Sequence, residues 1–424
     1  MARERRRTAV VGSGVAGLTA AHVLGRAHDV TLLEADGRVG GHAHTHELSS
    51  SDGRTHRVDS GFIVHNRRTY PNLLRLFDEL GVATQESEMS MSVRCEGCGL
   101  EYAGARGAAG LFARPGSVLR GPYLRMLAEV PRFHRAARAL LAVPEGTGVM
   151  TLGEFAARGR FSAYFSAHFL TPMVSAVWSC DPVTAMRYPA RYLFSFLEHH
   201  GMLSVGDSPV WRTVTGGSRE YVDRVAKQVH SLRTSTPVRT VRRLGGGGVE
   251  IVTEDGATEE YDSVVVATHP DQALRLLADP TDEERRTLGA FRYSRNPTLL
   301  HTDTTLLPRS RGAAASWNYL MPSCAADADR VTVSYDMNRL QRLDAPERFV
   351  VTLNGAERVD PDLVRARTVY EHPVFTPESV AAQAGLPALS GPVTAFAGAY
   401  HGWGFHEDGC RSGVRAAQAL GVTW

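Results

Sequence analysis

The stretch TAVVGSGVAGLTAAHVL (residues 8–24) decides the fold class of this 424-residue chain. It opens with short apolar and β-branched residues, which are typical of a buried parallel strand, and it ends with apolar residues at helical spacing. Between the two lies the pattern G-x-G-x-x-G. Gly12 allows a tight turn, Gly14 leaves room for a ligand beside the backbone, and Gly17 lets the helix pack closely on the strand. We therefore expect a strand, a turn and a helix whose N-terminus points at an anion.

A second strand and the acid at its end narrow the choice of anion. Val30 to Leu33 is another buried apolar run, and it ends in Glu34. A carboxylate there accepts hydrogen bonds from the hydroxyls of an adenosine ribose, and it favours a ribose with a free 2′-hydroxyl. The pattern therefore predicts FAD or NAD, with the pyrophosphate against Val15 and Ala16 and the ribose beside Glu34 and Ala35.

The next residues, EADGRVGG (34–41), indicate which of the two dinucleotides is expected. The form E-x-x-x-R-x-G-G resembles the extension of the dinucleotide motif in the flavin-dependent amine oxidase superfamily, which includes monoamine oxidases, protoporphyrinogen oxidase and phytoene desaturases. Arg38 would add a cation beside the pyrophosphate, and Gly40 and Gly41 would let the chain pass close to the flavin. The resemblance implies FAD. Non-covalent binding is expected because Cys410 does not sit in the linkage motif of the monoamine oxidases.

Three histidines follow the double glycine at alternating positions: His42, His44 and His46. The resemblance places His42 next to the flavin or pyrophosphate, although superfamily members often carry arginine there. His44 and His46 would continue on one face of a short strand. Zinc held by the three histidines is the alternative, but the sequence offers neither a fourth ligand nor a polar second shell. We therefore predict no metal site.

The resemblance also implies an α/β fold in which a Rossmann-like FAD-binding domain is interleaved with an α+β substrate-binding domain. On this basis the FAD-binding domain comprises residues 1–69, 212–290 and 390–424, and the substrate-binding domain comprises residues 70–211 and 291–389. A bacterial group within the superfamily resembles the chain over its full length, and the marks of that group here include ATHPDQALRLL (267–277), YEHPVF (370–375) and GFHEDG (404–409).

Further cofactor contacts follow from segments that match those of the superfamily. A D-x-G segment resembles the strand after the flavin loop, and a strand, a glycine turn and a helix over residues 393–420 resemble its closing flavin segment. The usual acid after the glycine is Ala399 here, so either Glu407 or Asp408 takes over the contact with the ribityl hydroxyls or no residue does. The additional cofactor residues implied are Gly61, Phe62, Val238, Thr268, Gly398, Gly404, Phe405, His406 and Glu407.

Candidate catalytic side chains come from the segments expected to touch the flavin: His42, Tyr400, Trp403 and His406. Tyr400 and Trp403 are placed to wall a substrate against the flavin, as aromatic pairs do in amine oxidases, and a histidine is a reasonable proton acceptor. The alternative is that each residue only packs around the cofactor. Many amine oxidases hold a lysine near flavin N5. The one lysine of this chain, Lys227, does not match that position, which disfavours an oxidase of that design.

The predicted substrate-binding domain contains many aromatic residues and one basic stretch. Residues 106–138 hold seven arginines and a single acid, Glu129, with Phe133 and Ala137 at helical spacing. A helix with one face in the core and a solvated back is the simpler interpretation. The alternative is a surface that contacts anionic lipid and delivers an acyl chain to the flavin.

These observations lead to one functional prediction and two alternatives. The prediction is an FAD-dependent oxidoreductase that takes a hydride from a carbon of an apolar substrate, by desaturation or double-bond isomerisation of a fatty acyl or other lipid chain. The first alternative is a flavin amine oxidase that acts on a small amine or amino acid. The second is a non-catalytic flavoprotein partner of a lipid methyltransferase, because members of the bacterial group often occur beside cyclopropane-fatty-acid-synthase-like methyltransferases.

Composition excludes other classes. A net charge of +2 without a basic, aromatic stripe gives no reason to expect nucleic acid, and no apolar run approaches the roughly 20 residues of a membrane span. The five cysteines lack the spacing of a disulfide framework, which predicts reduced thiols and therefore a cytoplasmic protein. If the substrate is a lipid, we expect the protein to lie at the surface of the inner membrane. Cys95 and Cys98 form a lone C-x-x-C, which we interpret as a hairpin tip, with a redox or metal pair as the alternative.

Overall fold

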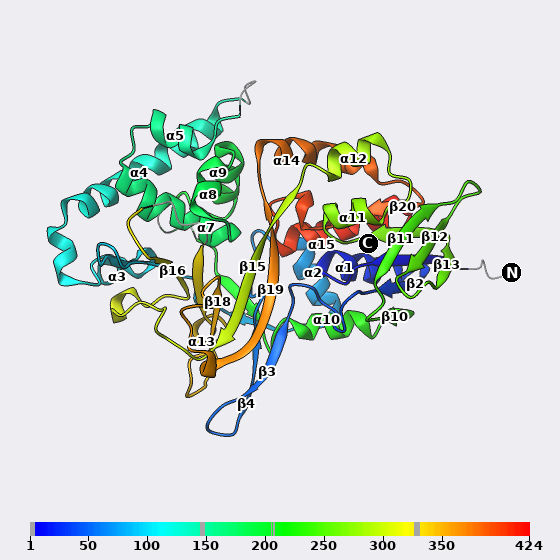
Figure 1. The fold of residues 1–424 in the computed structure, drawn as a ribbon, viewed down its shortest axis with the longest axis horizontal. Coiled ribbons are helices and arrows are strands. Elements are labelled where there is room, and N and C mark those ends of the chain that lie inside the picture. Colours follow the sequence, from blue (N-terminus) through cyan, green and yellow to red (C-terminus); the bar gives the residue numbers. More distant parts are fainter. Residues whose placement is uncertain (1–4, 145–148, 205, 207, 326–330) are drawn as a thin grey trace.

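A parallel sheet forms the centre of one half of the molecule, which lies on the right in Figure 1. The computed structural model describes residues 5–144, 149–204, 206, 208–325 and 331–424. The sheet has the strand order β10-β2-β1-β14-β20, and all of its neighbouring strands are parallel. Its strands are β1 (Arg6–Val11), β2 (His28–Leu33), β10 (Ser231–Arg233), β14 (Ser263–Val266) and β20 (Thr394–Phe396).

Alternate residues of these strands are buried on opposite faces of the sheet. Val10 and Val265 pack with α1 (Val15–Leu24), α10 (Arg219–Ala226) and α15 (His406–Ala419). Ala9 and Val264 pack on the other side. That second face is covered by β11 (Val238–Arg243), β12 (Val249–Thr253), β13 (Thr258–Tyr261), α11 (Pro270–Leu276) and α12 (Asp282–Leu288). Helices on one face and a small antiparallel sheet on the other therefore enclose the sheet.

Helix α2 (Pro71–Leu80) ends at Gly81, which adopts the left-handed conformation with φ of 67°, as the sequence predicts. Its apolar residues Leu73 and Phe77 lie in the same hydrophobic cluster as α1 and α15. Helix α2 lies within the predicted substrate-binding domain, but it therefore packs on the half of the molecule that contains the parallel sheet. The reason is that α2 is amphipathic and buries its apolar face against α1 and α15.

The other half of the molecule is built on a seven-stranded sheet of order β19-β15-β18-β17-β16-β7-β8. Its two long strands, β15 and β19, lie side by side between the two halves (Figure 1). The strands are β7 (Met91–Cys95), β8 (Glu101–Ala103), β15 (Arg292–His301), β16 (Trp317–Met321), β17 (Thr332–Asp336), β18 (Val350–Leu353) and β19 (Val364–Val374). The expected hairpin around Cys95 and Cys98 is formed by β7 and β8.

A group of helices packs on this sheet and supplies most of the buried aromatic residues. Phe133 on α4 is fully buried, and five phenylalanine rings surround it, with centroids 5.5–6.2 Å away. Arg135 and Arg138 lie on the exposed back of α4, so the basic stretch has a core-facing stripe. The helices are α3 (Gly107–Leu111), α4 (Gly121–Ala142), α5 (Leu152–Arg158), α6 (Ala163–Phe165), α7 (Thr171–Trp178), α8 (Pro182–Arg187) and α9 (Ala190–His199).

Smaller elements connect the halves. The hairpin of β3 (Thr45–Ser49) and β4 (Thr55–Asp59) projects from the molecule, and β5 (Val64–Asn66), β9 (Trp211–Val214) and β6 (Thr84–Glu86) form a short sheet. Helices α13 (Met337–Leu340) and α14 (Pro377–Ala382) complete the fold. Among the helices described, none combines the length and the apolar character that crossing a membrane requires.

Candidate nucleotide groove and substrate chamber

A cavity of about 1080 Å³ extends from the parallel sheet to the seven-stranded sheet. One end is formed by residues that follow β1, β2, β14 and β20. The carboxyl ends of parallel strands meet at one sheet edge, which is where such α/β sheets bind ligands. We call this end the nucleotide groove, and it comprises residues 11–16, 33–36, 38, 41, 236–238, 267–268 and 398. The other end, which β7, α7, α9 and β16 to β19 line, is the substrate chamber.

The glycine turn of the groove has the geometry that its sequence predicts. Gly12 has φ of 98°, and a Cβ atom on Gly17 would lie 1.9 Å from the Gly12 carbonyl oxygen. A Cβ atom on Gly14, in contrast, would meet no atom within 4 Å. Gly12 and Gly17 are therefore required by the protein itself, whereas the space beside Gly14 is left for a ligand at the N-terminus of α1.

Two charged side chains of the groove fit the rest of a dinucleotide. The Glu34 carboxylate lies at the end of β2 and accepts hydrogen bonds of 2.9 Å from the amides of Ser13 and Asp36. Arg38 donates from Nη2 to the Gly41 carbonyl at 2.8 Å, while its Nη1 is buried without a partner in the described part of the chain. A buried N–H without an acceptor is costly, and a pyrophosphate beside Nη1 would supply the missing acceptor and a counter-charge for the guanidinium.

The loop after the double glycine separates the three histidines. His42 lines the cavity, and its Nε2 is buried with no hydrogen-bond partner among residues 5–144, 149–204, 206, 208–325 and 331–424. The rings of His44 and His46 contact each other in a tilted arrangement, with centroids 4.0 Å apart. His44 contacts the Tyr370 hydroxyl at 3.3 Å, and His46 contacts the Ser60 hydroxyl at 2.9 Å. The three rings therefore do not converge on one point as metal ligands would.

His42 is a neutral side chain in this setting. Burial, followed by the nearby imidazole of His372, lowers its pKa well below the usual 6.5. A Cβ atom on Gly61 would lie 2.1 Å from the His42 carbonyl oxygen, and the amide of Phe62 donates to that oxygen at 2.7 Å. The D-x-G segment thus holds the His42 loop in place. An uncharged imidazole stands where superfamily members often carry arginine.

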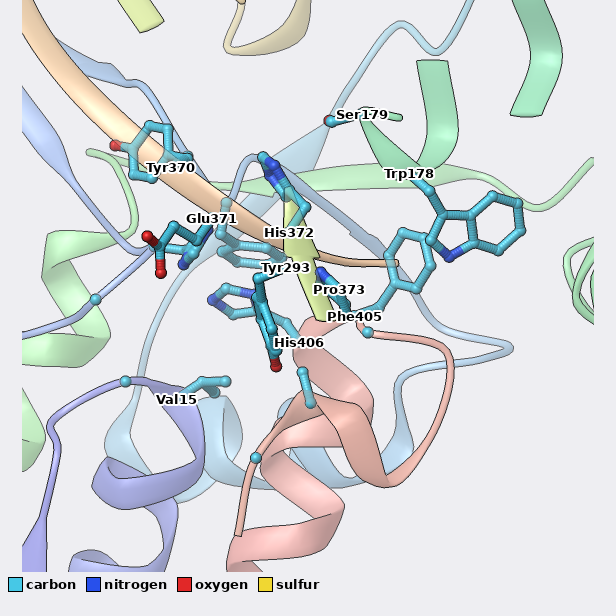
Figure 2. A pocket seen from close by; sticks show the side chains of 18 of the residues that line it. Val15, Trp178, Ser179, Tyr293, Tyr370, Glu371, His372, Pro373, Phe405 and His406 are labelled. Atoms are coloured by element: carbon cyan, nitrogen blue, oxygen red, sulfur yellow. The ribbon is translucent and has the colours of Figure 1, made fainter. Parts of the chain in front are cut away.

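Strand β19 forms the wall opposite the N-terminal ends of α1 and α15 (Figure 2). The Tyr370 hydroxyl lies 2.7 Å from that of Ser60, and burial raises the Tyr370 pKa to about 12. Asn296 donates to His372 Nδ1 at 3.0 Å, and burial lowers the His372 pKa to about 4. At neutral pH this wall presents an uncharged phenol and an uncharged imidazole to the cavity.

The closing turn brings α15 to the cavity. This helix begins at His406, which lines the cavity, so its positive dipole end faces the cavity. The His406 ring stacks on Phe62 with centroids 3.6 Å apart, and burial lowers its pKa to about 3. Phe405 stacks on Phe196 at 4.8 Å. The N-terminal and C-terminal segments of the chain therefore meet at one site.

Comparison with known proteins identifies the family. The family described as flavin containing amine oxidoreductase matches residues 15–301, about two thirds of the chain. The chain belongs to this family. Its members are FAD-dependent oxidoreductases, so FAD is the dinucleotide that the groove holds, as the sequence predicts. The α/β architecture with interleaved segments also agrees with the solved amine oxidase folds.

Relatives within the family differ in the substrates that their names give. The chain is 30% identical to a carotenoid phi-ring synthase of Streptomyces griseus, over 64% of this chain and 53% of the relative. It is 26% identical to an (S)-6-hydroxynicotine oxidase of Paenarthrobacter nicotinovorans, over 65% and 63%. The matches thus span about half to two thirds of these relatives. A solved fatty acid isomerase from P. acnes shares the fold, with a TM-score of 0.68, 17% identity, and coverage of 97% and 98%.

Most of the residues predicted for this amine oxidase-family site line the cavity, and four do not. Gly17 and Gly40 support the turn from behind: Gly17 packs on Gly12, and the Gly40 amide donates to Ser13. The other two, Trp403 and Glu407, are treated below. The predicted residues that line the cavity are Gly12, Gly14, Val15, Ala16, Glu34, Ala35, Arg38, Gly41, His42, Gly61, Phe62, Val238, Thr268, Gly398, Tyr400, Gly404, Phe405 and His406.

Glu407 has a structural role in place of the predicted contact with the cofactor. Its carboxylate accepts hydrogen bonds from the Asn72 side chain at 2.6 Å and from the Leu73 amide at 3.0 Å, at the N-terminus of α2. Asp408 binds the Phe405 amide at 3.1 Å within α15. Neither carboxylate reaches the cavity, so Ala399 has no acidic substitute at these positions. The first turn of α15 directs both side chains away from the groove.

Trp403 packs outside the cavity and not against a substrate position. Its ring lies 5.3 Å from that of His199 and 5.8 Å from that of Phe196, and its carbonyl accepts from Trp178 Nε1 at 3.0 Å. Tyr400 lines the cavity, but its ring packs edge-on against Phe291 in the core at 5.4 Å. The predicted aromatic pair is therefore not assembled by these two residues.

Side chains of β15 and β19 form the wall that sequence reasoning missed. Tyr293, Tyr370, Glu371, His372 and Pro373 all line the cavity. YEHPVF marks the bacterial group within the family, but strand periodicity alone does not say which face of β19 meets the cofactor. Lys227, in turn, is exposed at the C-terminal end of α10 and does not line the cavity.

Proposed function

We propose that this amine oxidase-family protein is an FAD-dependent oxidoreductase that acts on an apolar chain, by desaturation or double-bond isomerisation of a fatty acyl or other lipid substrate. The observation that carries the proposal is the lining of the substrate chamber. Methionine and aromatic side chains dominate it, and methionine adapts its shape to a flexible chain. The residues concerned are Met89, Met91, Tyr102, Phe169, Met173, Trp178, Phe196, Met202 and Trp317.

The charges near the chamber offer an amine substrate no free acid among the described residues. An ammonium group buried in a cavity requires an acid partner or an aromatic cage. Among the residues that the structure describes, the one acid that lines the chamber side of the cavity is Glu371, which lies 3.4 Å from His269 Nδ1 and 3.5 Å from Arg295 Nε. Its charge is therefore engaged within the protein. An uncharged chain places no such demand on the walls.

The histidines at the junction of the groove and the chamber are uncharged at neutral pH. They can therefore take part in proton transfer in their resting state. FAD bound in the groove supplies a hydride acceptor. His42 is the candidate proton acceptor, because it is neutral and its Nε2 has no partner within the described ranges. His372 holds its Nδ1 toward Asn296, which leaves its Nε2–H as a donor. The pair offers an acceptor and a donor with ring centroids 5.3 Å apart.

The named relatives support the proposal in part. The carotenoid phi-ring synthase forms, by its name, a ring of a carotenoid, and the fatty acid isomerase acts, by its name, on a fatty acid. The hydroxynicotine oxidase, by its name, acts on an amine-containing substrate. The choice between the two classes therefore rests on the chamber and not on the relatives.

Anaerobic incubation with defined substrates tests the proposal. The FAD-loaded protein would be mixed separately with an unsaturated fatty acid, its phospholipid ester, a polyene and a panel of amines. Flavin absorbance reports net oxidation, and mass spectrometry of double-bond positions reports isomerisation that leaves the flavin oxidised. A new or shifted double bond supports the proposal. Bleaching by an amine would favour the amine oxidase. Bleaching by dithionite alone, with tight binding to a lipid methyltransferase, would favour the non-catalytic partner.

A pair of tryptophan variants separates the chamber from the fold. Met173→Trp places a large ring inside the chamber, so we expect normal FAD content but at least a tenfold weaker binding of the lipid, about 1.4 kcal/mol. Val183→Trp adds the same ring on α8 at a side chain that is 57% exposed, and it should change neither. Equal effects of the two variants would contradict a lipid-binding role for the chamber.

We also propose that an anionic lipid surface contacts the segment before and within the start of α4. Leu119 is 87% exposed and Val118 is 48% exposed, and Arg125 has a side chain that is 66% exposed. Exposed apolar residues next to arginine fit an interface with anionic headgroups. Co-sedimentation with anionic vesicles, but not with neutral ones, is the expected result. Leu119→Ser should reduce it, whereas Val210→Ser, at another exposed site, should not.

A further inference from the structure

The hairpin between β7 and β8 lies against two remote segments, and together they gather four side chains with metal-binding chemistry. Cys95 and Cys98 come from the hairpin, Cys324 follows β16, and His168 lies on a π-helical turn before α7. One ligand atom from each of the four lies within 4.8 Å of all the others. The C-x-x-C that appeared alone in the sequence therefore has a thiol and an imidazole beside it.

Two of the separations between these atoms match the edges of a tetrahedral site. The Sγ atoms of Cys95 and Cys324 are 3.6 Å apart, and Cys98 Sγ lies 3.7 Å from His168 Nε2. Zinc bonds of about 2.3 Å to sulfur and 2.0 Å to nitrogen predict edges of roughly 3.8 Å and 3.6 Å in a tetrahedron. All of the chain's cysteines are free thiols, so no disulfide accounts for the approach.

His168 is held in the orientation that a metal ligand needs. Its Nδ1 lies 3.2 Å from the Tyr164 carbonyl oxygen, to which only an N–H can donate, so Nε2 keeps a free electron pair directed at the thiols. The Tyr164 ring stacks on the imidazole at 3.9 Å and fixes its plane. A histidine bound to a metal usually donates its second nitrogen to a carbonyl or carboxylate in this way.

The hairpin backbone is also shaped around the sulfur atoms. The amides of Cys98 and Leu100 form hydrogen bonds to the sulfurs of Cys95 and Cys98, respectively. A Cβ atom on Gly97 would lie 2.9 Å from the Cys324 amide nitrogen, so glycine is needed for the second segment to approach. Arg120 donates to the Cys98 carbonyl at 2.7 Å and places a positive charge beside the cluster.

We propose that Cys95, Cys98, Cys324 and His168 bind one zinc ion. Four protein ligands leave no open position, which makes this a structural and not a catalytic site. The ion would tie the β7–β8 hairpin and the end of β16 to the helices. Because Phe169 follows His168 and lines the substrate chamber, the ion would also hold one chamber wall in place.

Metal analysis of the wild-type protein is the first test. Untagged protein purified with reductant, and without a chelating column, should contain close to one zinc per chain. After exchange with cobalt, the wild type should show thiolate charge-transfer bands and intense ligand-field bands in the red, beyond the flavin absorption. Zinc-supplemented protein that remains metal-free, or cobalt protein without these bands, would overturn the proposal, as would a Cys95–Cys324 disulfide in its place.

Variants then assign the ligands. Cys324→Ser changes an exposed residue and should reduce the zinc content at least fivefold while FAD content is kept. Cys410→Ala removes a buried cysteine that lies outside the cluster and should retain full zinc. Full zinc content in both Cys324→Ser and His168→Ala would overturn the assignment. If a variant does not fold, the cobalt spectrum of the wild type still decides whether a thiolate-rich tetrahedral site exists.

Discussion

The nucleotide groove and the substrate chamber are two ends of one cavity, but they are built in different ways. The groove is made largely by residues 11–41, which include the glycine turn, and residues 236–238, 267–268 and 398 add the rest. The chamber is made by side chains from β7, α7, α9 and β16 to β19, which are far apart in the sequence. Recognition of a phosphate by a turn is local, whereas recognition of an apolar chain is spread over many surfaces. Phosphate recognition therefore leaves a motif in the sequence, and recognition of an apolar chain does not.

The largest effect that this comparison predicts is at Gly17. Because its Cβ atom would overlap the Gly12 carbonyl, Gly17→Ala should give no folded protein that carries FAD. Soluble yield, circular dichroism and bound flavin measure the effect. The contrasting variant is Gly14→Ala, whose Cβ atom meets no protein atom. It should fold normally and bind FAD at least tenfold more weakly, about 1.4 kcal/mol. Equal behaviour of the two variants would contradict the division between supporting and ligand-facing glycines.

A chamber-side substitution should destabilise the protein without altering the groove. Phe133→Ala removes a fully buried ring that packs against five others, at an expected cost of about 3–5 kcal/mol. Chemical denaturation measures the loss, and the FAD dissociation constant measured under folding conditions should stay unchanged. A matched loss of FAD affinity would mean that the two ends of the cavity fold as one unit.

Acid should weaken the junction between the two regions. The buried imidazoles of His372 and His406 have pKa values of about 4 and about 3, so between pH 6.5 and 5 the unfolded chain binds more protons than the folded protein. Stability is therefore complete above about pH 6.5 and falls on acidification, by about 2 kcal/mol per imidazole at pH 5. Asp59 and Asp408 oppose this trend in part, since burial raises the pKa of each to about 6.

Thermal unfolding at pH 5 and pH 7 measures this acid effect. His406→Phe keeps a ring stacked on Phe62 but cannot be protonated, so its acid sensitivity should be smaller than that of the wild type. A variant with unchanged acid sensitivity would show that the buried imidazole of His406 does not carry the effect.

The smallest of these effects is expected at Arg38. Arg38→Met keeps an unbranched apolar stem but removes the guanidinium, and we expect FAD to bind about 10–100-fold more weakly. Titration with FAD measures the change, and Arg158→Met on α5 is a control outside the cavity. Unchanged affinity would show that Arg38 has another anion as its partner.

Sequence reasoning succeeded where local geometry determines the outcome. Gly12, Gly14 and Gly17 define a turn through conformational limits that are visible in the residues themselves. It failed at Glu407, because the spacing in GFHEDG does not say that the first turn of α15 points this carboxylate at the N-terminus of α2. The position of Trp403 depends on its packing against His199 and Phe196 of α9, which the local sequence does not show. The wall of β19 was missed because its partner strand and its exposed face depend on the whole sheet.

The cysteines show both what sequence spacing can predict and what it cannot. Cys95 and Cys98 were visible as a pair, and the hairpin around them was predicted correctly. Cys324 and His168 joined them only because β16 pairs in parallel with β7 and because the π-helical turn lies beside the hairpin. Contacts between segments so distant in sequence carry no local pattern, so no spacing rule finds them.

The packing of α15 on α1 has a consequence for biosynthesis. A Cβ atom on Gly413 would lie 2.3 Å from the Ala16 carbonyl oxygen, so the two helices are in intimate contact, and β20 adds the edge strand of the parallel sheet. The ribosome delivers Gly413 long after Ala16. The glycine turn must therefore wait, with one face uncovered, until the closing helix has left the ribosome, and stable loading of the flavin can only follow that point.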